Sequence, residues 1–279
     1  MRRTALLVLL VSLVAAACGG GDPTSGTSPF PADAFAFPAS SNVAVGPERL
    51  LIAVSDESGT RLPSPDAPVE VVLYPEDRRD EALTVDADFV WAIPDVSGLY
   101  KVNVVFDEPG IWEAEVRPAT GPGLEPFPFQ VLPEPLTVGV GEPAPRSDTF
   151  TADDVDDLSE ITTDPDPEPD FYELSVAEAV TSGRPSVIVF ATPAFCQTAI
   201  CGPTMDSMKE LAPRFPDANF LHVEVFTNLD DPENLQTVPA VVEWGLPTEP
   251  WIFVVDETGT VVGRFEGTVT ESELADLLG

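Results

Sequence analysis

The sequence predicts two folded units, an all-β sandwich followed by an α/β unit, and three observations lead to this fold class. The stretch 41–132 consists of short runs that alternate apolar and polar residues, with no sustained helical periodicity. The stretch 171–279 contains a continuous apolar run at 187–190 flanked by helix-like patterns. An acidic, proline-rich segment, 133–170, separates them.

The N-terminus has the pattern of an export signal. Arg2 and Arg3 follow Met1, and the apolar run from Ala5 to Ala17 that comes next is too short for a permanent bilayer span. The segment Leu13–Gly19 resembles the lipobox of bacterial lipoproteins, although Ala15 stands where that family prefers leucine. The alternative is an ordinary secretory signal cut near Ala17.

The lipobox resemblance implies a signal peptide at 1–17 and diacylation of Cys18. Residues 18–40, rich in Gly, Ser, Thr and Pro at their start, then form a flexible tether. We therefore expect an extracytoplasmic protein of the cell envelope, lipid-anchored to the bacterial cell membrane.

Acidic residues dominate the composition and limit the partners. The formal charge is −35 at pH 7, from 48 acidic and 13 basic residues. Such a surface repels phosphate backbones, so no nucleic acid partner is expected, and membrane contact is expected through the lipid alone. No acidic cluster has the regular spacing of a calcium loop, and neither a metal nor a cofactor is expected.

The apolar runs between 41 and 132 predict short antiparallel strands packed as a sandwich of about ninety residues. Asp95–Tyr100 followed by VNVVF resembles the tyrosine corner of immunoglobulin-like domains, with Val102 where an antibody has cysteine. The resemblance implies an immunoglobulin-like sandwich held by apolar packing. The expected core aromatics are Trp91, Tyr100, Phe106 and Trp112. The segment 133–170 is expected to be an extended connector.

In the second unit, Ser175 and Glu178 form a capping box that starts a helix, and Gly183 ends it. The remaining expected elements are a strand at 187–190, a helix at 203–211, a strand at 220–226, a hairpin of 251–255 with 261–265, and a helix at 271–278.

Two cysteines, Cys196 and Cys201, follow the first of these strands, where α/β sheets place their sites. The element order, these cysteines, and the segment Trp244–Pro250 running into WIFVVD resemble the thioredoxin family. The resemblance implies thiol–disulfide exchange, a cis-proline at Pro250, and substrate contacts from Phe195, Glu249 and Pro250. The implied partners are extracytoplasmic protein thiols or disulfides.

The spacing of the cysteines departs from the thioredoxin motif, because four residues separate them instead of two. Five positions apart on a regular helix they would point away from each other, so a disulfide requires a loop. Gly202-Pro203 permits one by starting the helix after Cys201. Cys196 is then the exposed nucleophile, and Cys201 resolves it.

The stretch from Thr192 to Cys196 with a resolving cysteine at this spacing also resembles the bacterioferritin-comigratory peroxiredoxins. That resemblance implies a thiol peroxidase, but Pro193 stands where the family has threonine, and neither Arg214 nor Arg264 has a matching context.

His222 and Glu224 lie two residues apart on one expected strand, so they share one of its faces. They are candidates for a proton relay to Cys201. Two further alternatives remain open. A copper chaperone would use both thiolates and His222, and a non-catalytic binding module would keep the disulfide as a structural lock.

Overall fold

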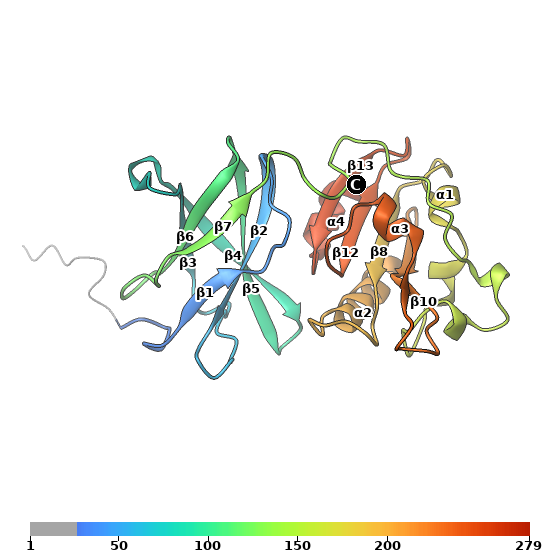
Figure 1. Ribbon diagram of the computed structural model, residues 1–279, viewed down its shortest axis with the longest axis horizontal. Helices are drawn as coiled ribbons and strands as arrows, with labels where there is room; N and C mark the ends of the chain where they lie inside the picture. The colour runs from blue at the N-terminus through green and yellow to red at the C-terminus, as the bar shows by residue number, and fades with distance from the viewer. Residues whose placement is uncertain (1–26) are drawn as a thin grey trace, which may run out of the picture.

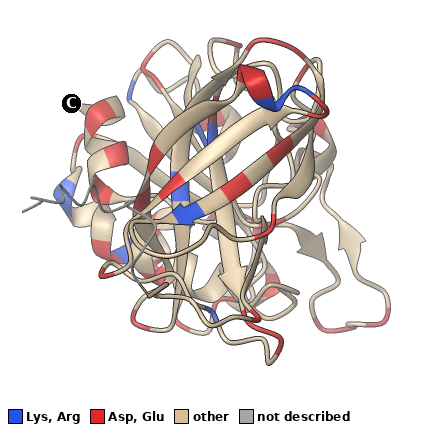
Figure 2. Cartoon of the chain, turned by 90° about the vertical axis from the view of Figure 1, so that its left-hand side faces the viewer, with Lys and Arg blue, Asp and Glu red and all other residues tan. Residues whose placement is uncertain are grey.

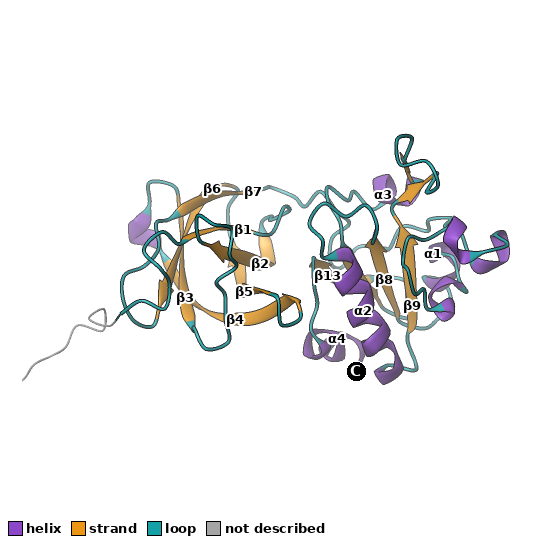
Figure 3. Cartoon of the chain, turned by 90° about the horizontal axis from the view of Figure 1, so that it is seen from below, coloured by secondary structure: helices purple, strands orange, loops and turns teal. Residues whose placement is uncertain are grey.

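The computed structural model describes residues 27–279, so the predicted signal peptide and Cys18 lie outside the described residues. Strands dominate: the described chain contains thirteen strands and four α-helices (Figure 3). Most of the strands belong to a seven-stranded sheet in the first half and a four-stranded sheet in the second (Figure 1).

The seven-stranded sheet is antiparallel throughout and has the order β1-β2-β5-β4-β3-β6-β7. Its strands are β1 (Phe35–Pro38), β2 (Gly46–Ser55), β3 (Val69–Pro75), β4 (Leu83–Ile93), β5 (Ser97–Phe106), β6 (Gly110–Pro118) and β7 (Phe127–Val131). The two edges approach each other beyond β1 and β7. There Val45 N–H donates to the carbonyl of Leu132 at 2.9 Å, and Leu132 N–H donates to that of Val43 at 2.8 Å. The sheet is therefore a nearly closed barrel.

The expected immunoglobulin-like sandwich is wrong, and β4 shows why. Its first part, Leu83–Ala87, pairs with β3, and its second part, Asp88–Ile93, pairs with β5. In a sandwich these two pairings would belong to two separate sheets, but here one strand makes both. Alternation of apolar and polar residues is common to sandwiches and barrels, so the pattern alone could not distinguish them.

The barrel interior holds the aromatic core. Tyr100, Phe106 and Trp112 are buried there as expected, and the Tyr100 hydroxyl donates to the carbonyl of Ala67 at 2.7 Å. Trp91 does not belong to this core: 39% of its surface is exposed, and its ring packs edge-on against Phe89. The register shift between Trp91 and Ile93 interrupts the regular pairing of β4 with β5 at this point.

A second apolar cluster lies on the opposite face of β2, β4 and β5. Its buried members are Leu51, Ala53, Val90, Ala92 and Leu99. We call this cluster the outer patch. Its residues alternate along the strands with core residues such as Ile52 and Tyr100, as side chains on opposite faces of one sheet must.

The four-stranded sheet has the order β13-β12-β8-β9, with one parallel pair, β8 and β9. Its strands are β8 (Ser186–Ala191), β9 (Asn219–Glu224), β12 (Trp251–Val255) and β13 (Val261–Glu266). The helices are α1 (Val176–Ala179), α2 (Cys201–Leu211), α3 (Pro239–Glu243) and α4 (Glu271–Leu278), and β10 (Phe226–Thr227) pairs with β11 (Gln236–Thr237). Apolar clusters cover both faces, one around Trp244 and Phe253 and one around Met205 and Met208.

The expected thioredoxin-like α/β class is also wrong for this chain. The structure is predominantly β, built around the large antiparallel sheet, and its α-helices are few. Two of the four helices, α1 and α3, span four and five residues, little more than one turn each. Apolar periodicity located the individual segments, but it does not determine how they assemble into a fold class.

The segments assigned to tether and connector carry ordered structure where they are described. Strand β1 lies within the range 18–40 and pairs with β2. Within 133–170, Gly141 N–H donates to the carbonyl of Val261 at 2.8 Å, and Val261 N–H donates to that of Glu142 at 2.9 Å. The connector therefore runs along the start of β13. In residues 27–279 no helix combines the length and apolarity needed to cross a bilayer.

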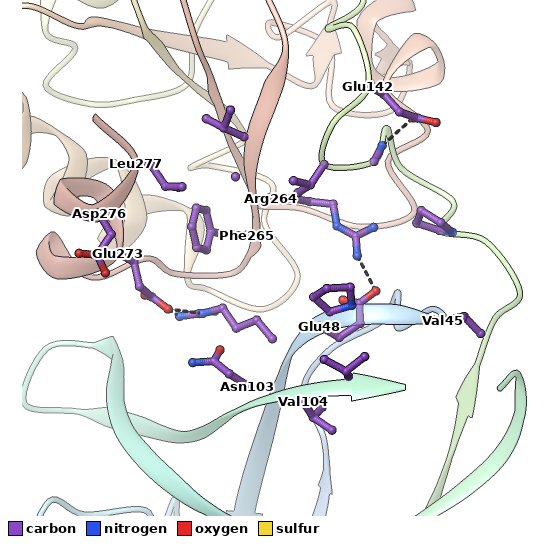
Figure 4. Close-up of a pocket in the computed structure, with 18 residues that line it drawn as sticks. Val45, Glu48, Asn103, Val104, Glu142, Arg264, Phe265, Glu273, Asp276 and Leu277 are labelled. Atoms are coloured by element: carbon purple, nitrogen blue, oxygen red, sulfur yellow. Dashed lines mark hydrogen bonds and ion pairs between the residues drawn. The ribbon is translucent and has the colours of Figure 1, made fainter. Parts of the chain in front are cut away.

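Ion pairs join the two halves. Arg264 Nη2 lies 2.7 Å from Glu48 Oε1, and Arg49 pairs with Glu273 of α4. These side chains line a cleft of about 730 Å³ between the sheets, in which Arg264 points toward Glu48 (Figure 4). Each half supplies one cation and one anion to these two pairs, so opposite charges face each other across the junction.

Candidate disulfide site

Cys196 and Cys201 form a disulfide with their Cα atoms 6.0 Å apart. The bridge closes a loop that follows β8, and α2 begins at Cys201 itself. Ala199, inside this loop, has a φ of 60°, a conformation that lets the chain turn back toward the helix. Pro203 occupies the first turn of α2, where its missing N–H has no intrahelical partner to lose. The predicted loop-plus-helix geometry is present.

The two sulfur atoms occupy different environments. Cys201 is fully buried beside Met205 and Met208, whereas Cys196 is partly exposed. Cys201 N–H donates to Cys196 Sγ at 3.3 Å, and Thr198 Oγ1 lies at the same distance from that sulfur. An N–H group at the start of a helix stabilises negative charge. An incoming thiolate can therefore reach Cys196 but not Cys201.

His222 lies on β9 with its ring nitrogens engaged by the protein. Nε2 donates to the carbonyl of Ala191 at 3.1 Å, which leaves Nδ1 as an acceptor beside the hydroxyls of Tyr172 at 2.7 Å and Thr162 at 3.2 Å. The side chain is buried, and burial lowers the pKa of His222 to about 4. The imidazole is therefore neutral at pH 7 and makes no hydrogen bond to either cysteine.

Glu224 is two residues further along the same strand and is also buried. Burial raises its pKa, although nearby hydrogen-bond donors oppose this shift, among them the N–H and hydroxyl of Thr163 and the N–H of Val225. Thr163 Oγ1 in turn accepts the N–H of Ala194 at 3.1 Å. Glu224 is therefore linked through Thr163 to the backbone two residues before Cys196, and not to Cys201.

The expected substrate-binding residues lie on two segments. Phe195 precedes the exposed cysteine and is partly buried. The Glu249–Pro250 peptide bond is cis, and the carbonyl of Pro250 accepts the N–H of Gly267 at 2.9 Å. Thr204 of α2 donates its hydroxyl to the carbonyl of Gly267 at 2.8 Å. Gly267 thus connects the Pro250 segment to the helix that carries Cys201.

Glu249 has its own local environment beside this segment. Its side chain is half-buried, and burial raises the pKa of its carboxyl. No lysine or arginine pairs with it among residues 27–279.

Sequence reasoning missed the partners that surround these residues. Thr162 and Thr163 come from the connector, and Tyr172 lies just after it. Their polar side chains gave no periodic signal. Ile200, inside the disulfide loop, packs against the outer patch of the barrel. One feature of the sequence could have indicated this contact: Ile200 is a large apolar residue in a loop whose other residues are small or polar.

Neither arginine considered for a peroxidase faces the cysteines. Arg214 pairs with Glu271 of α4 at 2.5 Å, and Arg264 pairs with Glu48 across the junction. Thr192 is buried, and its hydroxyl has no hydrogen-bond partner in the structure. The arginine that a peroxiredoxin site requires is therefore not supplied by either candidate.

Within residues 27–279, no group of three or more His, Cys, Asp or Glu side chains is arranged to hold a metal ion. The ring nitrogens of His222 are directed to Ala191 and Tyr172 instead of the cysteines. The three groups that a copper chaperone would use are therefore not brought together. Acidic residues occur in strands, helices and loops alike, with few basic residues among them (Figure 2).

The chain was compared with known proteins. No protein-family model matches it, and no curated protein shows significant similarity to it. The family resemblances inferred from local motifs therefore receive no support from similarity over longer stretches of sequence.

Proposed function

We propose that the protein carries out thiol–disulfide exchange through Cys196 and Cys201, with extracytoplasmic protein thiols or disulfides as partners. One observation supports this most directly. The disulfide joins a partly exposed cysteine, Cys196, in the loop before α2 to a fully buried cysteine, Cys201, at the start of that helix. This asymmetry directs attack to a single sulfur atom, which exchange through a mixed disulfide requires.

The exchange step follows from this arrangement. A substrate thiolate attacks Cys196 Sγ, a new disulfide bond forms between the two, and the Cys196–Cys201 bond breaks. The electron pair passes to Cys201 Sγ, which takes up a proton. A second substrate thiolate then attacks the substrate sulfur and releases Cys196 as a thiolate. Two substrate thiols are oxidised, the protein disulfide is reduced, and the reverse sequence reduces a substrate disulfide.

Single-cysteine variants test the proposal. Cys201→Ala leaves the accessible thiol, so the reduced variant should form a stable mixed disulfide with glutathione disulfide, measured as an adduct by intact-mass spectrometry. Cys196→Ala leaves only the buried thiol and should react far more slowly. Cys18→Ser is introduced into all variants so that each has one thiol.

Equal reactivity of the two variants would remove the basis of the proposal, because the asymmetry would then have no chemical effect. Failure of the Cys201→Ala thiol to react with glutathione disulfide and with Ellman's reagent would favour a structural disulfide instead. Folding of each variant is checked by near-ultraviolet circular dichroism before the reaction.

We further propose that the protein is exported and anchored through a lipid on Cys18, as the lipobox resemblance implies. Expression of the full chain in a bacterial host should place it in the membrane fraction, and Cys18→Ser should release it. Retention of the Cys18→Ser variant in the membrane would contradict the proposal.

A further inference from the structure

The disulfide loop contacts the other half of the molecule. Ile200, the residue before Cys201, packs against the outer patch, whose members include Leu51 of β2 and Val90 of β4. The five buried residues of the outer patch lie on the outside of the barrel, yet each is less than 10% exposed. The loop and the β1 segment, through Phe37 and Ala39, cover them.

Two further contacts fix the position of this packing. A Cβ atom at Gly267 would lie 3.5 Å from Cδ1 of Ile200 and 3.9 Å from Cδ1 of Leu51, so the three residues meet at one point. Thr268 Oγ1 donates to the carbonyl of Trp91 at 3.3 Å, next to that point. Figures 1 and 3 show the end of the barrel that carries β4 and β5 facing α2.

The contact has a consequence for the cysteines. Ile200 is bonded directly to Cys201, and the carbonyl of Ile200 accepts the N–H of Thr204 at 2.8 Å, which is the first helical hydrogen bond of this segment. Holding Ile200 against the barrel therefore holds the first turn of α2, and with it Cys201, in place relative to Cys196. In the reduced protein this packing limits how far the two thiols can separate.

We propose that Ile200 is a positioning residue of the redox site, and that the β-barrel is part of that site because its outer patch seats Ile200. This inference rests on the proposed function for its biological meaning. Its physical content is that docking of Ile200 favours the disulfide over the dithiol, and that disulfide formation favours docking to the same extent.

The test is the equilibrium between disulfide and dithiol forms of the full chain in dithiothreitol buffers. The fraction of free thiols is the measured quantity. Ile200→Ala should lower the equilibrium constant for disulfide formation about fivefold, the lower end of typical coupling between sites. Leu51→Ala, on the barrel side of the contact, should shift it in the same direction. The double variant should change the free energy of disulfide formation by less than the sum of the changes in the two single variants.

The matched control is Ile111→Ala, which removes the same atoms from an isoleucine of β6 that is 40% exposed and outside the outer patch. It should leave the equilibrium constant unchanged. A loss of stability that is equal in the oxidised and reduced forms would change the melting temperature without changing this constant, so the readout separates positioning from a merely structural role.

Unchanged equilibrium constants in Ile200→Ala and Leu51→Ala would overturn the inference. If Ile200→Ala does not fold, Ile200→Val and Leu51→Ala decide the question. Failure of the inference is distinguishable from failure of the proposed function. Dithiothreitol measures the equilibrium whether or not protein substrates react, and the glutathione adduct of Cys201→Ala reports exchange whether or not Ile200 matters.

Discussion

Arg49 and Glu273 form a two-point ion pair across the junction of the two sheets, with Nε to Oε1 at 2.7 Å and Nη2 to Oε2 at 3.2 Å. Lys101 Nζ approaches the same carboxylate at 3.3 Å. Both cations belong to the barrel, and Glu273 belongs to α4. The last helix is therefore attached to the first sheet through one carboxylate that two cations share.

Acid should weaken this junction. Burial raises the pKa of Glu273, but the hydrogen bond and charge of Arg49 and the N–H of Thr270 outweigh it and lower the pKa to about 2 from 4.5. Because the folded state holds the carboxyl ionised, its stabilisation is present above pH 4.5 and is lost as the pH falls toward 2. Glu273→Gln should cost about 1 to 2 kcal/mol at pH 7 and flatten the pH dependence in this range.

Urea unfolding at a series of pH values measures this effect. The control is Glu271→Gln on the same helix, whose side chain is half exposed and pairs with Arg214. Surface ion pairs contribute little, so Glu271→Gln should change stability by less than about 1 kcal/mol. Equal effects of the two substitutions would contradict the role assigned to Glu273.

The single histidine should make the protein less stable in mild acid. Burial lowers the pKa of His222 to about 4 from 6.5, so between these values the unfolded chain binds a proton that the folded chain does not. Stability is fully present above pH 6.5 and should fall by about 2 to 3 kcal/mol as the pH is lowered to 4. His222→Gln removes this slope, which thermal unfolding across the range detects.

The same variant tests the predicted proton relay. His222 makes hydrogen bonds to Ala191, Tyr172 and Thr162 and none to a cysteine. We therefore expect His222→Gln to leave the rate of disulfide reduction by dithiothreitol within about twofold of the parent at pH 7, where the ring is already neutral. A much larger loss of rate, in a variant that remains folded, would support the relay.

A methyl group at Gly245 should destabilise the fold by more than about 2 kcal/mol. The residue has a φ of 66°, and a Cβ atom there would clash with the carbonyl oxygen of Leu136 in the connector. Gly183→Ala is the matched control, because Gly183 has a φ of 76° and nothing lies within 4 Å of its Cβ position.

The control substitution, Gly183→Ala, should lower the free energy of unfolding by about 1 kcal/mol, from backbone conformation alone. Thermal or urea unfolding measures the difference between the two variants, which isolates the steric term. Similar losses in both would mean that the connector moves aside freely at Leu136.

Local patterns predicted much of the secondary structure and part of the site. The apolar run at 187–190 lies inside β8, the hairpin pattern around Asp256 matches β12 and β13, and the capping box at Ser175 is formed. The disulfide, closed by a loop that ends where α2 begins, also agrees with the expectation from Gly202-Pro203. Each of these depends on residues that are close together in the sequence.

The remaining features depend on contacts between distant segments. The fold class depends on β4, which joins both parts of the barrel, and alternation within β4 is the same whichever strands it pairs with. The packing of Ile200 against Leu51 joins positions about 150 residues apart that share no local signal. The hydrogen bonds of Thr162 and Thr163 to His222 and Glu224 arise in the same way from a segment without periodicity.

The connector lies along the start of the edge strand β13 of the four-stranded sheet, where it blocks pairing by another chain. An edge strand with free N–H and carbonyl groups can add a strand from another molecule and start aggregation. At the start of β13, the hydrogen bonds that Val261 exchanges with Gly141 and Glu142 occupy groups that such a strand would use. The acidic side chain of Glu142 and the neighbouring Pro143 further discourage a second chain from pairing at this edge.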